Sequence, residues 1–265
     1  MDILLVGGAG GLGCAISAYL AERGYRVFSC DIGDAHCMHS NVVKMTMDIT
    51  NPANIRETFE SVSQMSGGLD AIISIAGVYV MDSLIEISEE KLAHILDVNL
   101  MGVYRINKAF LPLLNEGGRI IITTSELAGQ KPLPFNGIYT MTKSALETYA
   151  DSLRLELQLI GVKVINIKPG AFDTQMVSST DAQAKQLMKN TKLYKMGAQK
   201  FVAVMHSQTG GAKDPDVLAK VFHKALTAKC PRMTYYKNAS VGLKLYSIMP
   251  RRLQAFVIRL ILKSK

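Results

Sequence analysis

Three residues with complementary chemistry follow one another in the middle of the chain. Ser125 ends a strand-like run that starts at Arg119, and Tyr139 and Lys143 come shortly after it. A tyrosine and a lysine four residues apart on a helix share a face, so we expect the ammonium to lower the phenol pKa from about 10 towards 7. Such a phenol can move a proton to or from a substrate oxygen. We interpret these residues as a proton-transfer site.

The spacing alone does not select this pair, because Tyr104 and Lys108 have the same spacing. The run over 119–124 predicts a buried parallel strand that delivers Ser125 at its carboxyl end, where open α/β sheets bind ligands. No such strand precedes Tyr104. We therefore predict that Tyr104 and Lys108 are ordinary residues of a packed helix.

A glycine-rich turn from Val6 to Gly13 is the second chemical signal. Its glycines let the backbone turn sharply and approach a pyrophosphate, while the amides at the helix start face the anion. Asp31 ends the next predicted strand, where a carboxylate can accept hydrogen bonds from an adenosine ribose and repel a 2′-phosphate. The turn and Asp31 together predict a dinucleotide site that prefers NAD to NADP.

Apolar runs of strand length alternate with amphipathic segments of helical length, which is typical of a parallel sheet with helices on both faces. Strands are predicted at residues 2–6, 26–31, 42–45, 69–76, 119–124, 162–167 and 233–236. Helices are predicted from Leu12 to Arg23, from Ser88 onward and after Tyr139. Since no Pro/Ser-rich stretch divides the chain, we predict one α/β domain of the doubly wound Rossmann type over residues 1–265.

The four cysteines show neither a C-x-x-C pair nor zinc-ligand spacing. We interpret His36, Cys37 and His39 as a surface turn, so no metal site is predicted. The chain opens directly on a strand-like segment, and this start favours a reducing cytoplasm as the compartment.

Charge is distributed unevenly along the chain. The net charge is +8, yet 17 of the 30 lysines and arginines lie from Lys185 onward, opposed only by Asp214 and Asp216. These residues are dispersed through helical patterns without a nucleic-acid motif, so no nucleic acid is expected as a partner. An anionic ligand, an anionic membrane surface and a solvated helical face stay open as explanations.

These motifs, in this order, make the chain similar to the short-chain dehydrogenase/reductase family over nearly its whole length. The resemblance implies catalytic roles for Asn99, Ser125, Tyr139 and Lys143. It implies cofactor contacts from Gly7, Gly11, Leu12, Gly13, Asp31, Asp48, Ile49, Ala76, Gly77, Tyr139, Lys143, Pro169, Gly170 and Thr174. The sequence around Ser125 and Tyr139 resembles retinol and 17β-hydroxysteroid dehydrogenases most.

The chain departs from the family pattern in the cofactor turn, where Val6 replaces the usual threonine, and at Ser74-Ile75, where the family has two asparagines. The distance from Ser125 to Tyr139 is also one residue longer than is usual. Val6 and Ser74 end strands that we expect to be neighbours, so one change can accompany the other.

The resemblance implies an NAD-dependent oxidoreductase that interconverts a secondary alcohol and a ketone, assembled as a homodimer or homotetramer. Tyr139 would be the general acid and base, and Ser125 would bind the substrate oxygen. Lys143 would lower the tyrosine pKa and bind the nicotinamide ribose, while Asn99 would hold a water that connects Lys143 to solvent. An NAD-using epimerase and a non-catalytic dinucleotide-binding regulator are the alternatives.

The segment 175–211 is helical in pattern and is expected to be a substrate lid. Its flexible apolar residues are Met176, Leu187, Met188, Leu193, Tyr194 and Met196, and its lysines at 185, 189, 192, 195 and 200 form a candidate basic stripe. Adaptable methionines suit a bulky apolar ligand. We therefore expect a hydrophobic substrate with an acidic tail, such as a steroid or bile acid, with retinol or another lipid alcohol at a membrane surface as the alternative.

The last segment, 241–265, is an apolar and basic C-terminal extension. Arg252, Arg259 and Lys263 fall on one helical face of a largely apolar run that ends at Leu262. This run is too short and too charged to span a bilayer. Three roles stay open, namely peripheral contact with a membrane, cover over the pocket and packing in an oligomer.

Overall fold

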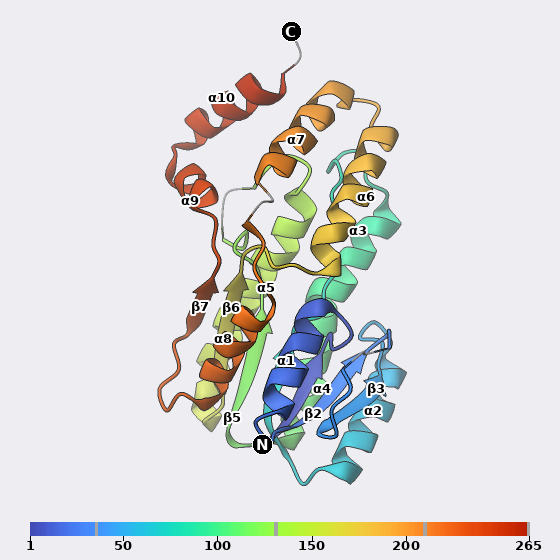
Figure 1. Ribbon diagram of the computed structural model, residues 1–265, viewed down its shortest axis with the longest axis vertical. Coiled ribbons are helices and arrows are strands. Elements are labelled where there is room, and N and C mark those ends of the chain that lie inside the picture. Colours follow the sequence, from blue (N-terminus) through green and yellow to red (C-terminus); the bar gives the residue numbers. More distant parts are fainter. Residues whose placement is uncertain (35–36, 130–131, 209–210, 264–265) are drawn as a thin grey trace.

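The computed structural model describes residues 1–34, 37–129, 132–208 and 211–263. Seven strands form a sheet in the order β3-β2-β1-β4-β5-β6-β7 (Figure 1). The strands are β1 (Asp2–Val6), β2 (Arg26–Asp31), β3 (Val42–Thr46), β4 (Leu69–Ser74), β5 (Leu114–Thr123), β6 (Lys163–Pro169) and β7 (Thr234–Lys237). All neighbouring pairs are parallel, so the predicted doubly wound sheet is confirmed.

Aliphatic residues fill the central strands because helices cover both faces of the sheet. Ile72, Ile73 and Ile121, for example, are fully buried. The predicted boundaries are wrong by a few residues at several strands. Thus β5 starts five residues earlier than Arg119, and β4 ends at Ser74 because the next two amides both donate to the Val6 carbonyl oxygen.

Two hydrophobic clusters lie on opposite faces of the sheet. One face is covered by α2 (Pro52–Met65), α4 (Val103–Phe110) and α5 (Gly137–Leu157), and the other by α1 (Gly11–Ala21) and α8 (Asp216–Thr227). Phe110 and Leu146 belong to the first cluster, while Leu20 and Phe222 belong to the second. This division confirms the expected helices on both faces.

Shorter helical pieces complete the connections. They are α3 (Glu89–Leu96), the π-helix Asp97–Gly102 that joins α3 to α4, and the 3₁₀ turns Leu111–Leu113 and Gln158–Ile160. The predicted helix start at Ser88 is confirmed, since its side chain caps α3 by accepting a hydrogen bond from the Lys91 amide.

Four helices lie beyond the carboxyl edge of the sheet (Figure 1). They are α6 (Gln175–Asn190), α7 (Lys195–Gln208), α9 (Val241–Ile248) and α10 (Arg251–Leu262). The segment predicted as a lid, residues 175–211, therefore contains two helices, α6 and α7. They pack against each other through a hydrophobic cluster that contains Leu187 and Phe201. The Met176 side chain, residues 209–210, the last two residues and His36 of the predicted surface turn lie outside the described part.

Candidate active site

Tyr139 and Lys143 lie one turn apart near the start of α5, and both are buried. The Tyr139 phenol is hydrogen-bonded with Ser125, which stands just past the end of β5. Lys143 Nζ donates to the carbonyl oxygen of Thr123 at 3.1 Å and lies 5.9 Å from the centroid of the Tyr139 ring. The structure thus brings the three predicted residues together at the carboxyl edge of the sheet.

The expected net fall of the Tyr139 pKa towards 7 is wrong for this structure. Burial raises the pKa of Tyr139 to about 12, although its hydrogen bond with Ser125 acts in the opposite direction. Burial also lowers the pKa of Lys143 to about 8. The sequence could not reveal this reversal, because it arises from elements that fold around both side chains. At neutral pH the phenol carries its proton and can donate it.

Asn99 lies in the π-helix between α3 and α4 and is fully buried. Its amide oxygen accepts a hydrogen bond from the Val78 amide at 2.8 Å, and its amide nitrogen donates to the Val78 carbonyl oxygen at 2.9 Å and to Thr142 Oγ1 at 3.1 Å. Thr142 in turn donates to the carbonyl oxygen of Tyr139. Asn99 therefore connects the segment after β4 to α5, while its role in holding a water stays a prediction.

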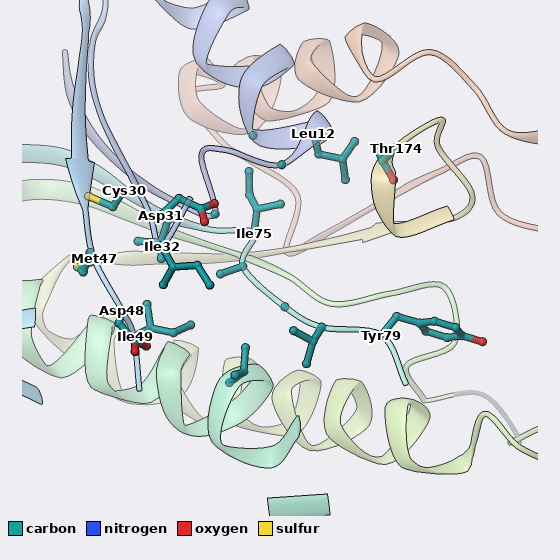
Figure 2. A pocket seen from close by; sticks show the side chains of 18 of the residues that line it. Leu12, Cys30, Asp31, Ile32, Met47, Asp48, Ile49, Ile75, Tyr79 and Thr174 are labelled. Carbon is teal, nitrogen blue, oxygen red and sulfur yellow. The ribbon is translucent and has the colours of Figure 1, made fainter. Parts of the chain in front are cut away.

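A cavity of about 540 Å³ opens at the carboxyl ends of β1 to β4 (Figure 2). Ten of the fourteen expected cofactor residues line it, namely Gly7, Gly11, Leu12, Gly13, Asp31, Asp48, Ile49, Ala76, Gly77 and Thr174. The cavity lies where the strand order reverses between β1 and β4, which is the ligand-binding position of open α/β sheets. Its volume falls in the range of small-ligand and cofactor sites.

The remaining expected cofactor residues lie outside this lining. Tyr139 and Lys143 adjoin it, since Lys143 Nζ would be 3.3 Å from a Cβ placed on Gly77. Pro169 and Gly170 lie farther along the edge, where the Gly170 amide donates to the carbonyl oxygen of Lys237. Pro169 and Gly170 are therefore not among the described residues that line the cavity, and their contact with the nicotinamide stays a prediction.

The glycine turn is packed so closely that side chains do not fit. A Cβ on Gly7, whose φ is +99°, would lie 2.5 Å from the Ala76 nitrogen, and one on Gly13 would lie 2.1 Å from the Gly7 carbonyl oxygen. The start of α1 is thereby held against the end of β4. Open backbone at a helix N-terminus suits the phosphates of a dinucleotide, so the residues present fit this group.

Two carboxylates mark the far end of the cavity (Figure 2). Asp31 Oδ2 accepts a hydrogen bond from the Ala9 amide at 2.9 Å, and its Oδ1 accepts one from the Gly33 amide at 3.1 Å. Hydrogen bonds from Thr50 hold the pKa of Asp48 below its usual value. Among the described residues that line the cavity there is no lysine or arginine, so this end is negatively charged.

Sequence reasoning missed Tyr79 and Gln183. The Tyr79 ring meets the Tyr139 ring edge to face with 5.1 Å between centroids, and its hydroxyl donates to Asn136 Oδ1 at the start of α5. Gln183 of α6 donates to the Tyr79 carbonyl oxygen at 2.6 Å and accepts from the Met81 amide at 2.8 Å. The position of Tyr79, two residues after Gly77, was a usable signal, whereas nothing in the sequence distinguishes Gln183.

The chain is similar to two proteins that are named as a dehydrogenase and a reductase. It is 28% identical to estradiol 17-beta-dehydrogenase 2 of Mus musculus over 97% of this chain and 74% of that protein. It is 31% identical to 3-ketodihydrosphingosine reductase of Bacteroides thetaiotaomicron over 65% of this chain and 64% of that protein. The chain therefore spans about two thirds to three quarters of the length of these two relatives.

A solved structure supports the fold. The aldohexose dehydrogenase of Thermoplasma acidophilum superposes with a TM-score of 0.75 at 17% identity, covering 94% of this chain and 96% of that one. A family model described as short chain dehydrogenase matches residues 2–185, which include the glycine turn, Asn99, Ser125, Tyr139 and Lys143. The chain belongs to the short-chain dehydrogenase/reductase family of oxidoreductases, which bind a nicotinamide dinucleotide.

Proposed function

We propose that the protein uses NAD to interconvert a secondary alcohol and a ketone on a hydrophobic substrate. One observation carries this proposal, namely that Ser125, Tyr139 and Lys143 meet beside the dinucleotide cavity at one edge of the sheet. When bound, the dinucleotide supplies or accepts the hydride. The residues of the chain handle the proton and the substrate oxygen.

Tyr139 gives its proton to the substrate oxygen in the reducing direction and removes it in the oxidising direction. Ser125 Oγ accepts a hydrogen bond from the Leu127 amide at 3.1 Å, which orients the hydroxyl so that it can donate. Such a donor, aimed at an oxygen that gains negative charge, contributes about 3 kcal/mol in a dry site.

Lys143 stabilises the phenolate that forms when the proton leaves Tyr139. With 5.9 Å between Nζ and the ring centroid, the attraction is about 3 kcal/mol at an effective dielectric constant of 20. This attraction opposes the burial that raises the phenol pKa. Lys143 also adjoins Gly77 in the cavity wall, which supports its proposed contact with the nicotinamide ribose.

The preference for NAD over NADP rests on the charged end of the cavity. The carboxylate of Asp31 is held in place by two amides, and no described lysine or arginine lines the cavity to pair with a 2′-phosphate. A ribose with free hydroxyls can donate to this carboxylate, whereas a phosphate is repelled by it.

The hydrophobic substrate is supported by the lid helices and by the relatives. Leu193 between α6 and α7 and Met196 in the first turn of α7 are exposed, and four of the five lysines of the predicted basic stripe are also exposed. The fifth, Lys200, donates instead to the carbonyl oxygen of Lys263. The two relatives are named for estradiol and for a ketosphingoid base. We propose a steroid or bile acid as the substrate.

The test starts from cofactor titration by calorimetry, followed by a panel of steroids, bile acids, retinol and ketosphingoid bases read by NADH absorbance. Tyr139→Phe is expected to lower kcat about 10²–10⁴-fold, since it removes the general acid and base. Tyr104→Phe is the matched control, because Tyr104 has the same spacing to a lysine but lies exposed on α4. The assignment is wrong if Tyr139→Phe keeps most of the turnover. Turnover of retinol alone would favour the lipid-alcohol alternative.

A further inference from the structure

The chain ends in two short helices, α9 and α10, that carry only positive charge. From Val241 to Lys263 there are five basic residues and no aspartate or glutamate. The basic residues are Lys244, Arg251, Arg252, Arg259 and Lys263. All five side chains are exposed. Neither the catalytic residues nor the dinucleotide cavity uses this surface.

Large apolar side chains lie exposed on α9 among these charges. Val241, Leu245 and Ile248 are 70%, 56% and 77% exposed. They are four and three residues apart, so they form one stripe along the helix, and Lys244 falls on the same face. A soluble surface rarely gathers residues of this kind without a partner.

The helix α10 shows the same arrangement more clearly. Its inner face carries Gln254, which is buried and donates to the carbonyl oxygen of Tyr246, and Leu262, which packs against the cluster between α6 and α7. Its outer face carries Leu253, Phe256 and Leu260, which are 45%, 62% and 72% exposed. The helix is therefore fixed by one face, and a stripe of large apolar residues is left in solvent on the other.

Basic residues run beside this apolar stripe. Arg252, Arg259 and Lys263 are seven and four residues apart, so they share the outer face of α10 with Phe256. An apolar stripe flanked by arginine and lysine is the pattern of a helix that lies in the headgroup region of a membrane.

The turn between α6 and α7 extends the same surface. Leu193 in this turn is 68% exposed, and Met196 in the adjoining first turn of α7 is 52% exposed. The end of α10 lies beside the start of α7, because Lys200 Nζ donates to the carbonyl oxygen of Lys263 at 2.8 Å. Figure 1 draws α7, α10 and the α6–α7 turn at the same end of the molecule, away from the amino edge of the sheet.

We propose that the exposed residues of α9, α10 and the α6–α7 turn form a docking surface for an anionic phospholipid bilayer. The bilayer accepts the apolar stripes in its interfacial layer, and its headgroups pair with the arginines and lysines. A second copy of this chain docked on the same surface would bring like charges together, since residues 241–263 include no aspartate or glutamate. Lipid is thus the occupant whose charge is complementary.

The docking also gives a route for the substrate, provided that the proposed function holds. Docking would set the α6–α7 helix pair against the bilayer, while Gln183 of α6 lines the dinucleotide cavity. An apolar alcohol dissolved in the bilayer would then reach the site without crossing water. Docking itself is measured without any substrate, so failure of the two proposals can be told apart.

A single reporter residue tests whether α10 enters the lipid. The chain has no tryptophan, so Phe256→Trp introduces the only one. On vesicles of phosphatidylcholine with about 30% phosphatidylserine, we expect its emission to shift to the blue and to be quenched by brominated lipid. Leu159→Trp is the control, because Leu159 is 83% exposed but precedes β6 at the opposite edge of the sheet. Its emission is expected to stay unchanged.

Charge variants test the electrostatic part by vesicle co-sedimentation. The triple variant Arg252→Gln, Arg259→Gln, Lys263→Gln is expected to lose about 100-fold in vesicle affinity, since each basic residue near an anionic surface contributes about fivefold. The control Lys220→Gln, Lys224→Gln, Lys229→Gln removes the same charge from exposed positions in and after α8 and is expected to change affinity less than about threefold.

Several results would overturn the proposal. One is absence of binding to anionic vesicles, and another is an equal loss in both triple variants, which would indicate net charge alone. A third is conversion of a dimer to a monomer by Leu253→Gln, Phe256→Gln, Leu260→Gln without vesicle binding by the parent chain, because a second copy would then cover the surface. Unchanged circular dichroism and NAD affinity in each variant exclude unfolding as the cause of lost binding.

Discussion

Tyr139 and Lys143 share one dry environment in which neither side chain favours its charged form. Burial raises the pKa of Tyr139 to about 12 and lowers that of Lys143 to about 8. The charges become favourable together, since a phenolate and an ammonium stabilise each other once both exist. The structure therefore holds Tyr139 ready as a proton donor and keeps Lys143 close enough to stabilise the phenolate.

The buried charge of Lys143 predicts a pH-dependent cost in stability. Its pKa falls from 10.5 to about 8 on folding, so the cost of burying the charge is complete below pH 8 and is relieved as the pH rises towards 10.5. That cost is about 3 kcal/mol, and the hydrogen bond to Thr123 offsets about 1 kcal/mol of it. We expect Lys143→Met to raise the free energy of unfolding by about 2 kcal/mol at pH 7 while abolishing turnover.

Urea unfolding at pH 7 and pH 9.5 measures this effect. The stabilisation by Lys143→Met is expected to shrink at the higher pH, because the wild-type lysine then loses its proton in the folded state. Lys108→Met is the control, since Lys108 is exposed on α4 and its replacement is expected to act equally at both pH values. A stabilisation that does not change with pH would contradict the buried charge.

Asp31 predicts the choice of cofactor. Asp31→Asn keeps the shape of the side chain but removes the charge that would repel a 2′-phosphate. We expect the ratio of the NADP and NAD dissociation constants to fall about tenfold, measured by calorimetry. Asp48→Asn is the control, because Asp48 follows β3 and also carries a charge in the cavity wall. We expect it to change the ratio of the two dissociation constants about twofold at most. An equal change of this ratio in both variants would contradict the prediction that Asp31 is the residue next to the 2′-position of the adenosine ribose.

The helix α6 is attached at two places to the segment between β4 and α3. Gln183 bonds to the backbone of Tyr79 and Met81, and the carboxylate of Glu86 accepts hydrogen bonds from Thr191 Oγ1 and the Lys192 amide at the other end of the helix. Gln183 also lines the dinucleotide cavity, so the first attachment lies at the site, where the predicted lid would have to open. A lid must release some contact of this kind to admit its ligands.

We expect Gln183→Ala to loosen α6 without changing the chemistry. The KM for substrate should rise about tenfold, since the lost pair of hydrogen bonds is worth about 1–2 kcal/mol, while kcat changes less than about threefold. Hydrogen exchange of the α6 amides should become faster. Gln186→Ala, one turn farther along the same helix at an exposed position, serves as the control. A fall in kcat with unchanged exchange would instead assign Gln183 to the reacting groups.

The elements differ in how well the sequence predicts them. The strands were predictable because both faces of a parallel sheet are buried, so their central residues, such as 120–122 and 71–73, are continuously apolar. Val6 and Ser74 were expected at the ends of neighbouring strands, and the pairing of β1 with β4 confirms this. The bonds of Gln183 were not predictable, because Tyr79 and Met81 lie about 100 residues away in the sequence.

The molecule divides its charge and its tasks between two regions. The cavity is formed by residues up to Gln183, whereas most of the positive charge lies after Lys185. No helix in the described part of the chain combines the length and apolar character needed to cross a bilayer. The expected homodimer or homotetramer and the cytoplasmic location stay predictions. One contact between the two regions lies next to Ser125, where Glu126 Oε2 accepts a hydrogen bond from the Ser240 amide at the start of α9.

This contact predicts what the C-terminal helices contribute to the reaction. Removal of the chain after Asn238 is expected to leave the NAD dissociation constant within about twofold, because no residue of that segment is among the described lining of the cavity. The kcat/KM should fall, since Glu126 directly follows Ser125 and loses the amide that holds its carboxylate, whose pKa is already raised by burial. Calorimetry and steady-state kinetics with a soluble substrate measure the two effects.

Glu126→Ala in the full-length chain separates this contact from the rest of the C-terminal segment. If the contact carries the effect, this variant should reproduce the fall in kcat/KM and keep vesicle binding, because α9 and α10 retain their exposed surface. Loss of NAD binding by a folded truncated chain would contradict the division into two regions. A normal kcat/KM in Glu126→Ala, together with a fall after truncation, would assign the effect on kcat/KM to the packing of α10 against α7.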